Sequence, residues 1–529
     1  MRKLTILAII LSILLSACTR STNARLGGTL VPIIPVYDPN QPTSTPQPVV
    51  LPPTRVPGAP ISSPTPDGNV SAFPTFTPIA QVETQPAANP GMQSYTVADG
   101  DYPASIAGQF GITVDELLAA NNLSADTVIY PGDTLQVPVT NQNQLQAVSA
   151  AGTFNSSEYF KILPDSELVY GPASASLDIN AFVQQKGGFL SVFTQDVNGK
   201  TLTGAEVVSL VAHNYSINPR VLLALLEYQA GWLTNPTPAS AYNPIGFVDD
   251  FHQGLYRQLT WSASQLNTGF YAWREHRVQN WDLYDGSQIM PQPGINAGTA
   301  GVQQLFARLD GHDSWIVDTG PNGFFATFTS LFGYPFDFAI EPIVPADISQ
   351  PVLSLPFGPG ESWQFTGGPH AGWDVGTAWA ALDFAPPGEP VGCGAVDYWN
   401  TAVAPGLIVR ADNGAVIEDL DGDGLEQTGW TILYMHMEAR DRVQSGTYVN
   451  TGDHIGHPSC DGGLADADHI HIARRYNGVW IPAADPGAPF VMDGYVTSGT
   501  GTEYDGKLTN GSIVVEAWDG SNTLNQIKK

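Results

Sequence analysis

The spacing of apolar and polar positions divides the folded part of the chain into three stretches. Between residues 150 and 345, apolar side chains recur every three or four positions, which predicts helices, most clearly Thr203–His213, Pro219–Tyr228, Leu255–Arg274 and Ala297–Leu309. From about Pro351 short alternating runs are separated by glycine-rich turns, which predicts a β-rich domain. Residues 93–140 combine both periods: the strands Ser94–Ala98 and Thr134–Val137 are expected to flank helices near Ala104–Phe110 and Thr113–Asn121. The expected fold class is therefore multidomain, with an α+β, a mostly α and a β-rich domain in that order.

The first 18 residues have the pattern of an export signal. Arg2 and Lys3 precede an apolar run, Leu4–Leu15, which is too short to span a bilayer comfortably. The run ends in Leu15-Ser-Ala-Cys18, which resembles a bacterial lipoprotein signal and implies that Cys18 is lipidated. The alternative is an ordinary secretory signal with an incidental cysteine.

Residues 19–92 are rich in proline, threonine, serine and glutamine, and they carry almost no charge. Such a composition cannot bury a core and predicts a disordered tether. A tether after a lipid anchor would lift the folded domains away from a membrane, toward a cell wall.

Residues 93–140 resemble a LysM domain. The resemblance rests on the strand–helix–helix–strand order and on the motifs Tyr95-Thr-Val, Asn121-Asn122 and Tyr130-Pro-Gly-Asp-Thr-Leu. LysM domains bind polymers of N-acetylglucosamine in a shallow groove, which by resemblance would involve Asp101, Tyr102, Asn122 and Ile129. The family usually has Thr-Leu where this chain has Tyr102-Pro103. The alternative is a structural module without a ligand.

The helical stretch from 150 to 345 is similar to lysozyme-like lytic transglycosylases around Ile217–Trp232. Glutamine at position 229 occupies the place of that family's general acid, and a carboxamide cannot donate a proton as a carboxylic acid does. The resemblance therefore implies a degenerate module that holds glycan. Two alternatives stay open, an active glycosidase using Glu227 and a purely structural helical spacer.

Composition narrows the possible partners. The formal net charge is −29, from 21 basic and 50 acidic residues, which argues against nucleic acid as a partner. The chain has three cysteines. If Cys18 is lipidated, Cys393 and Cys460 remain, and an even pair in an exported protein predicts one disulfide. A thiolate metal ligand is the alternative.

The candidate chemistry lies in the last third of the chain. His469-Ile-His471 is expected in a strand, where residues two apart point to the same face. His370, Asp383 and His436 precede this pair, Asp383 thirteen residues after His370. Imidazoles and a carboxylate converging on one face are the ligands of a catalytic Zn²⁺, which keeps three protein ligands and one open position.

These residues, in this order, resemble the lysostaphin-type zinc endopeptidases of bacterial cell walls, and the Leu382-Asp-Phe context matches their β-lytic branch. The resemblance covers about residues 350–500. It implies that His370, Asp383 and His471 are the zinc ligands and that His436 and His469 are the two catalytic histidines. A competing assignment uses Asp374, because His370-Ala-Gly-Trp-Asp374 fits the His-x-x-x-Asp motif of most of the family. Residues 501–529 are expected to form a C-terminal β extension and tail.

A second candidate metal site is the acidic run Asp419, Asp421 and Asp423. It resembles the start of a calcium-binding loop, but position twelve is Trp430 where an EF-hand requires glutamate. The simpler interpretation is an acidic hairpin turn without a metal ion, and Ca²⁺ binding is the alternative.

Together these features predict an extracytoplasmic zinc metalloendopeptidase, anchored by lipid to a bacterial membrane, facing the cell wall and held on glycan by LysM. Its expected substrate is peptidoglycan, cut in a stem peptide or a glycine-containing bridge. Two other functions stay open, a catalytically silent wall-binding or amidase-activating lipoprotein and a glycan-cleaving enzyme acting through the middle domain.

Overall fold

The computed structural model describes residues 92–97, 103, 106, 114–121, 123, 129, 132–138, 160–238, 240–292, 294–388 and 392–529. The predicted signal, Cys18 and the tether up to residue 91 lie outside the described residues. Within the described part of the chain, no helix combines the length and apolar character needed to cross a membrane.

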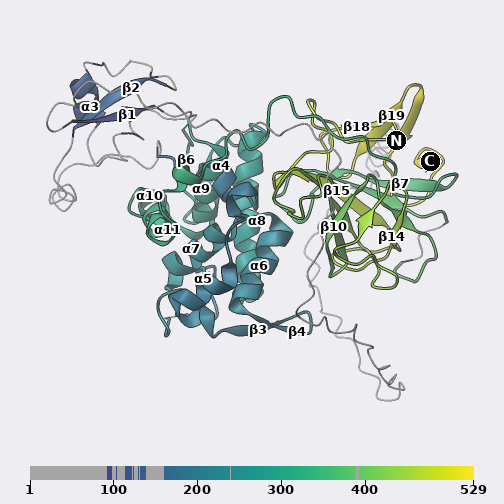
Figure 1. Ribbon diagram of the computed structural model, residues 1–529, viewed down its shortest axis with the longest axis horizontal. Helices are drawn as coiled ribbons and strands as arrows, with labels where there is room; N and C mark the ends of the chain where they lie inside the picture. The colour runs from purple at the N-terminus through teal and green to yellow at the C-terminus, as the bar shows by residue number, and fades with distance from the viewer. Residues whose placement is uncertain are drawn as a thin grey trace, which may run out of the picture. The chain divides into compact units, whose positions relative to one another are not determined.

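The N-terminal unit has both expected strands and the second expected helix (Figure 1), whereas the helix expected near Ala104–Phe110 lies largely outside the described residues. β1 (Met92–Thr96) pairs antiparallel with β2 (Thr134–Pro138), and α3 (Val114–Asn121) packs on them. The small core contains Val97, Ile106, Leu117, Leu135 and Val137. Of the predicted groove residues, Ile129 packs against this core, whereas Asp101, Tyr102 and Asn122 lie outside the described residues.

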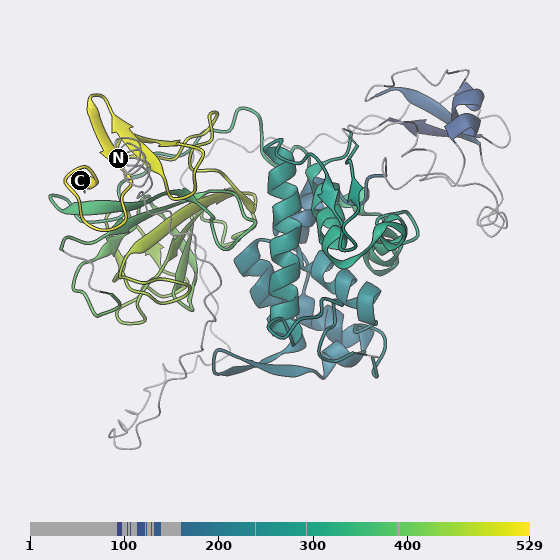
Figure 2. The same cartoon turned by 180° about the vertical axis from the view of Figure 1, so that it is seen from behind.

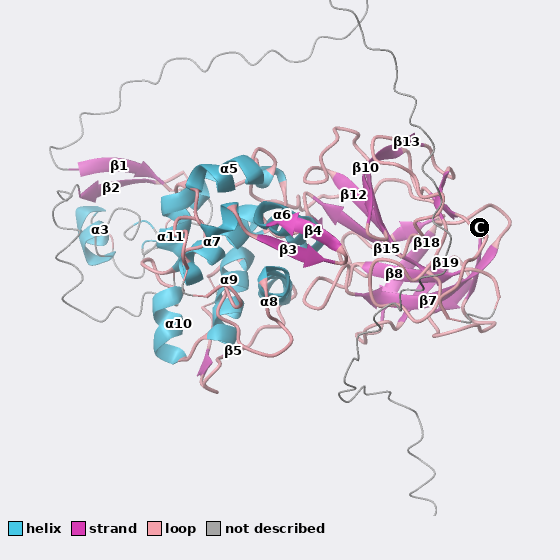
Figure 3. Cartoon of the chain, turned by 90° about the horizontal axis from the view of Figure 1, so that it is seen from below, coloured by secondary structure: helices cyan, strands magenta, loops and turns pink. Residues whose placement is uncertain are grey.

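The middle segment is helical (Figure 3). Its helices are α4 (Asp165–Leu168), α5 (Ile179–Lys186), α6 (Gly204–Tyr215), α7 (Pro219–Ala230), α8 (Leu255–Arg274), α9 (Ala297–Leu309), α10 (His312–Asp318) and α11 (Phe324–Phe332). Two hairpins interrupt them, β3 (Thr194–Val197) with β4 (Lys200–Thr203) and β5 (Trp281–Asp282) with β6 (Gln288–Ile289). Four of these helices coincide with the predicted ones to within three residues at either end.

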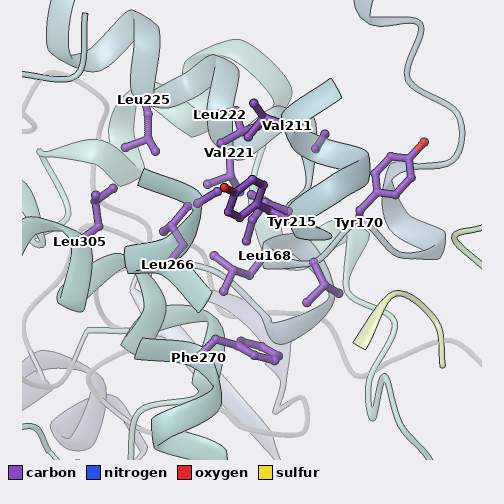
Figure 4. Close-up of a cluster of buried hydrophobic side chains, with 14 of the residues drawn as sticks. Leu168, Tyr170, Val211, Tyr215, Val221, Leu222, Leu225, Leu266, Phe270 and Leu305 are labelled. Carbon is purple, nitrogen blue, oxygen red and sulfur yellow. The ribbon is translucent and has the colours of Figure 1, made fainter. Parts of the chain in front are cut away.

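Local sequence signals explain where these helices begin. Thr203 caps α6 in a reciprocal capping box with Glu206, and α7 begins with Asn218 as its cap and Pro219 in its first turn. The long helix α8 is seen end to end in Figure 2. Leucines, valines and aromatic residues from these helices interlock in one core, including Leu168, Val211, Leu222, Leu266 and Phe270 (Figure 4).

The C-terminal segment is built on a mixed-length antiparallel sheet in the order β13-β10-β11-β12-β15-β8-β7-β21. Its strands are β7 (Ser362–His370), β8 (Ala381–Ala385), β10 (Gly406–Asp412), β11 (Ala415–Asp419), β12 (Trp430–Met435), β13 (Tyr448–Val449), β15 (Ile470–Tyr476) and β21 (Gln526–Lys528), with β16 (Val479–Trp480) beside β15. A two-stranded sheet joins β9 (Asn400–Thr401) to β14 (His454–Gly456). A four-stranded sheet contains β17 (Val491–Met492), β18 (Tyr495–Gly499), β19 (Gly506–Asn510) and β20 (Ile513–Glu516) in that order. The extension predicted from residue 501 is part of this unit, because β19 pairs with β18 and β21 pairs with β7.

The two faces of the main sheet bury different partners. On one face, side chains such as Leu382, Ile432 and Ile472 form the internal core of the β-rich segment. On the other face, Ala381, Leu433 and Ala473 belong to the same core cluster as the helices. The alternation is the period of two expected for strands covered on both sides.

Polar contacts reinforce this second face. Ser216 Oγ donates to Gly478 O at 2.6 Å, and the Trp480 backbone N–H donates to Tyr271 Oη at 2.9 Å. Arg475 Nη2 lies 2.8 Å from Glu426 Oε2, both side chains being buried. The helical and β-rich segments therefore share a continuous apolar and hydrogen-bonded boundary.

Candidate functional site

Three neighbouring strands bring the predicted ligand residues together. His370 ends β7, Asp383 lies in the middle of β8, and His471 lies near the start of β15. The register places His471 directly opposite Asp383, and Asp383 opposite Gly367. Since cross-strand partners point to the same face, the sheet itself converges these side chains.

The donor atoms form a compact triangle. His370 Nε2 and His471 Nδ1 are 3.0 Å apart, and each lies 3.3 Å from Asp383 Oδ1. A tetrahedral zinc with bonds of about 2.0–2.1 Å needs donors about 3.3 Å apart along each edge. All three residues are buried, at 3–7% exposure. The spacing therefore suits a small tetrahedral cation with one position left open.

The hydrogen bonds on the outer ring nitrogens fix which nitrogen faces inward. His370 Nδ1 lies 2.8 Å from Gly368 O, and His471 Nε2 lies 3.0 Å from Gly372 O. A carbonyl can only accept, so these nitrogens carry the protons and the inner nitrogens present lone pairs to each other. This outer shell of carbonyl acceptors is typical of metal-ligating histidines.

The electrostatics of the cluster favour added positive charge. Burial would raise the pKa of Asp383, but His370 and His469 hold it well below its usual range. Burial lowers the pKa of His370, yet the Asp383 carboxylate more than offsets this and the pKa is raised. Asp383 Oδ1 also accepts no well-formed hydrogen bond from the described residues, although it is buried. A buried carboxylate oxygen without a donor is the observation that a bound cation would explain.

The other two predicted histidines stand beside this cluster. The rings of His436 and His469 have centroids 4.4 Å apart, and His469 Nε2 lies 3.8 Å from Asp383 Oδ1. His436 Nδ1 is 3.0 Å from Asp461 O, and His469 Nδ1 is 2.9 Å from Ala467 O. Both side chains therefore keep Nε2 as a free acceptor. Burial, followed by the charges of His469 and His471, lowers the pKa of His436 to about 3, so its imidazole is neutral.

Gly367 is required by the close approach of β7 to the carboxylate. A Cβ at this position would lie 2.3 Å from Asp383 Oδ2 and 2.9 Å from its Cγ. Any side chain here would push Asp383 away from the histidines. The glycine therefore shapes the cluster of His370, Asp383 and His471 without contributing a side chain to it.

The predicted disulfide between Cys393 and Cys460 is present. Asp461, whose carbonyl faces His436 Nδ1, directly follows the second cysteine. Gly394 N–H also donates to Asp468 Oδ2 at 2.9 Å, next to His469. The disulfide therefore joins two loops that contact His436 and the segment next to His469. Both cysteine sulfurs are in the disulfide, so neither is a free thiolate.

Asp374, the competing ligand, lies outside the cluster. Its Oδ2 accepts a hydrogen bond of 2.7 Å from Tyr215 Oη of α6, and its Oδ1 accepts from Val375 N–H. The described residues that gather around a possible cation at this site are His370, Asp383 and His471. Asp374 instead ties the loop after His370 to the helical segment.

The acidic run Asp419, Asp421 and Asp423 does bring three carboxylate oxygens within 4.8 Å of one another. Those oxygens accept hydrogen bonds within the same loop: Asp419 from Gly422 and Gly424, and Asp423 from Leu425 and Thr428. The contacts are those of an acidic turn before β12. Calcium binding stays a prediction.

In the helical segment, Glu227 does not face open space. Its carboxylate accepts from Leu233 N–H, Thr234 N–H and Thr234 Oγ1, so it stabilises the turn after α7. Gln229 lies two residues further along α7, about 200° around the helix from Glu227, and is half-buried. The contacts of Glu227 among the described residues are structural, and the glycosidase alternative stays a prediction.

Sequence reasoning missed Tyr504. Its ring stacks on His370 with centroids 4.3 Å apart and an interplanar angle of 18°. It comes from the loop between β18 and β19, where Glu503 Oε1 also accepts from Ala371 N–H. The signal available was weak, a lone Glu-Tyr in a glycine- and threonine-rich turn 33 residues after His471.

A β-rich domain carries two histidines and an aspartate that converge on one sheet face, beside two further histidines, as expected from the sequence resemblance to lysostaphin-type metallopeptidases. The chain is homologous to Protease LasA of Pseudomonas aeruginosa, with 24% identity over 340 residues, which is 60% of this chain and 74% of the relative. The same match is found in a second strain of that organism.

Two family matches cover the preceding segments. Residues 95–138 match the LysM domain, which confirms that prediction, and residues 161–344 match the LasA N-terminal domain. The second match gives the helical segment a relative other than the lysozyme-like transglycosylases with which its sequence was compared. The similarity of the helical segment to lysozyme-like transglycosylases stays a prediction.

Solved structures that resemble part of the chain include peptidases and also the SpoIIQ–SpoIIIAH pore-forming complex. Pseudoalterin, an M23 metalloprotease from the deep sea, is 21% identical, covers 32% of this chain and 98% of its own, and has a TM-score of 0.26. The catalytic domain of lysostaphin from Staphylococcus simulans is 22% identical over 23% of this chain and 89% of its own, with a TM-score of 0.17. A zinc-containing peptidase from Vibrio cholerae is 16% identical over 26% and 41%, with a TM-score of 0.19.

Proposed function

We propose that the protein is a zinc-dependent endopeptidase that hydrolyses peptide bonds of peptidoglycan. The observation that carries this proposal is the triangle of His370 Nε2, His471 Nδ1 and Asp383 Oδ1, whose edges of 3.0–3.3 Å match a tetrahedral ion. These three residues would hold Zn²⁺. When bound there, zinc supplies polarisation of the scissile carbonyl and lowers the pKa of a water toward about 7.

His436 and His469 supply proton transfer. Each donates its Nδ1 proton to a backbone carbonyl, which leaves Nε2 free to accept a proton from the attacking water. The same nitrogen, once protonated, can donate to the departing amine. Neither residue belongs to the ligand triangle, so Nε2 of each keeps a lone pair for proton transfer.

The complete set of five residues favours an enzyme over a catalytically silent wall-binding protein. The LysM domain would hold the enzyme on glycan, and the resemblance to the β-lytic branch implies a glycine-containing bridge as the bond cut. The disulfide agrees with an extracytoplasmic location facing the cell wall. Lipidation of Cys18, and with it a membrane anchor, remains part of the proposal.

The proposal is tested by digesting purified peptidoglycan with the full chain and zinc, and reading the products by mass spectrometry. New amino termini that vanish with a chelator and in His436→Ala would support it. His312→Ala is the matched control, because this exposed histidine of α10 lies outside the cluster. New glycan ends without new amino termini would transfer the activity to the helical segment, and binding without cleavage would favour the silent binder.

A further inference from the structure

A polar pocket lies in the helical segment, between α8, α9 and the β5–β6 hairpin. Its volume is about 390 Å³, within the range of about 300–1,000 Å³ for small-molecule sites. α8 contributes Thr268 and Ala272, and α9 contributes Gln304. None of its lining residues belongs to the cluster of His370, Asp383 and His471.

Four of the ten residues that line this pocket are carboxamides. They are Gln279, Asn280, Gln288 and Gln304, of which the Gln288 amide already donates to Asp282 and the Gln304 amide to Gln265. Gln279 and Asn280 are exposed, and their side chains make no hydrogen bond to any described residue. They are therefore available to a ligand that both donates and accepts hydrogen bonds.

The two charged side chains that line the pocket, Arg277 and Asp282, each have a polar partner within the protein. Arg277 Nε lies 2.6 Å from Glu275 Oε2, and Asp282 Oδ1 accepts a hydrogen bond of 2.6 Å from Gln288 Nε2. One basic and one acidic side chain leave the lining without a net sign. Such a lining suits a neutral ligand rich in hydroxyl and amide groups rather than a phosphate or a charged peptide.

Thr268, which lines the pocket, also lies close to the loop that follows His370. A Cβ built on Gly376 of that loop would lie 2.5 Å from Thr268 Oγ1 and 2.4 Å from Ser264 O. The carbonyl oxygen of Gly372, in the same loop, accepts a hydrogen bond from His471 Nε2. The turn of α8 that lines the pocket therefore packs against the loop that orients a ligand of the metal cluster.

We propose that this pocket binds an N-acetylated amino sugar of the glycan strand, as a subsite additional to LysM. The hydroxyl and acetamido groups of such a sugar pair with the carboxamides, and the position beside the loop 371–380 brings the attached peptide toward the metal cluster. The choice of glycan as ligand rests on the proposed function.

The test is hydrogen exchange of the full chain, read by mass spectrometry, with the tetramer of N-acetylglucosamine as the probe. The expected result is protection of residues 277–288 and, separately, of residues 95–138. Replacing both Gln279→Ala and Asn280→Ala should weaken the binding that protects 277–288 about tenfold, since two hydrogen-bonding groups are lost. Gln253→Ala, an exposed carboxamide outside the pocket, should leave that binding unchanged.

Protection confined to residues 95–138 would overturn the proposal, and so would protection of 277–288 by a free stem tetrapeptide but not by the sugar. Peptidoglycan cleavage by the same preparations separates this inference from the proposed function. Cleavage without sugar protection of 277–288 refutes the pocket alone. Protection without new amino termini in the digest refutes the endopeptidase and leaves the pocket standing.

Discussion

Glu418 offers a test of the buried core beneath the sheet that carries Asp383 and His471. It lies on β11, fully buried, and its Oε2 accepts a hydrogen bond of 2.5 Å from Tyr434 Oη, while its Oε1 has no partner among the described residues. Burial is the main cause that raises its pKa from 4.5 to about 8. The folded protein therefore keeps a proton on Glu418 at neutral pH.

The sign and size of the effect follow from linkage. Below pH 4.5 both the folded and the unfolded chain hold this proton, so its stabilising contribution is fully present. Between pH 4.5 and about 8 the unfolded chain releases the proton and the folded chain does not, so stability falls as pH rises. At about 1.4 kcal/mol per unit, the loss between pH 5 and pH 8 is on the order of 4 kcal/mol.

We expect Glu418→Gln, which resembles the protonated acid, to remove this slope. The assay is urea unfolding at pH 5, 6, 7 and 8, followed by hydrogen exchange of peptides from β11 and β12, so that unfolding of other segments does not contribute. Other buried acids with raised pKa values, such as Glu167 and Asp310, are common to both proteins and cancel in the difference. Glu516→Gln, a half-exposed carboxylate on β20, is the control. Equal slopes in wild type and Glu418→Gln would mean that the Glu418 carboxylate is ionised in the folded core, and the reasoning would fail.

Three other outcomes are expected. Zinc at a free concentration 100-fold above its Kd should stabilise the protein by about 2.7 kcal/mol and a chelator should reverse this, as thermal unfolding would show; no response would contradict the metal site. Gly367→Ala should weaken zinc affinity about 10–100-fold in a metal-competition titration by displacing Asp383, whereas Gly294→Ala, with open space around it, should not; equal affinities would refute the steric account. Tyr215→Phe should lower the urea midpoint by the equivalent of about 1 kcal/mol through loss of the bond to Asp374, and an unchanged midpoint would show that this contact adds nothing.

The convergence of His370, Asp383 and His471 could largely be predicted from the identity of the side chains and the period of the strands. His469 and His471 lie two apart and were both expected in one strand, whereas β15 begins at Ile470 and His469 forms an isolated bridge with Ser459 just before it. Spacing alone left Asp374 and Asp383 in competition, since both follow His370. The cross-strand register, which pairs Asp383 with His471, is a property of the folded sheet and distinguishes their positions.

What the sequence could not supply depends on backbone atoms and on long-range packing. The carbonyls of Gly368 and Gly372 set the histidine tautomers, yet carbonyls are present at every position and leave no mark on the sequence. Tyr504 reaches His370 from a distant loop. The helical segment was correctly predicted as helices, but no local pattern indicated that Ala473 and Leu433 would join its core.

That common core has a consequence for how the protein can be rebuilt. Ala381, Leu433 and Ala473 pack against helices on the sheet face that also carries Asp383 and His471. A chimera that exchanges only residues 350–529 with a relative would pair two surfaces that were never matched to each other. The exchangeable module is residues 160–529, and its natural junction is the connection to the LysM unit, not the border between helices and strands.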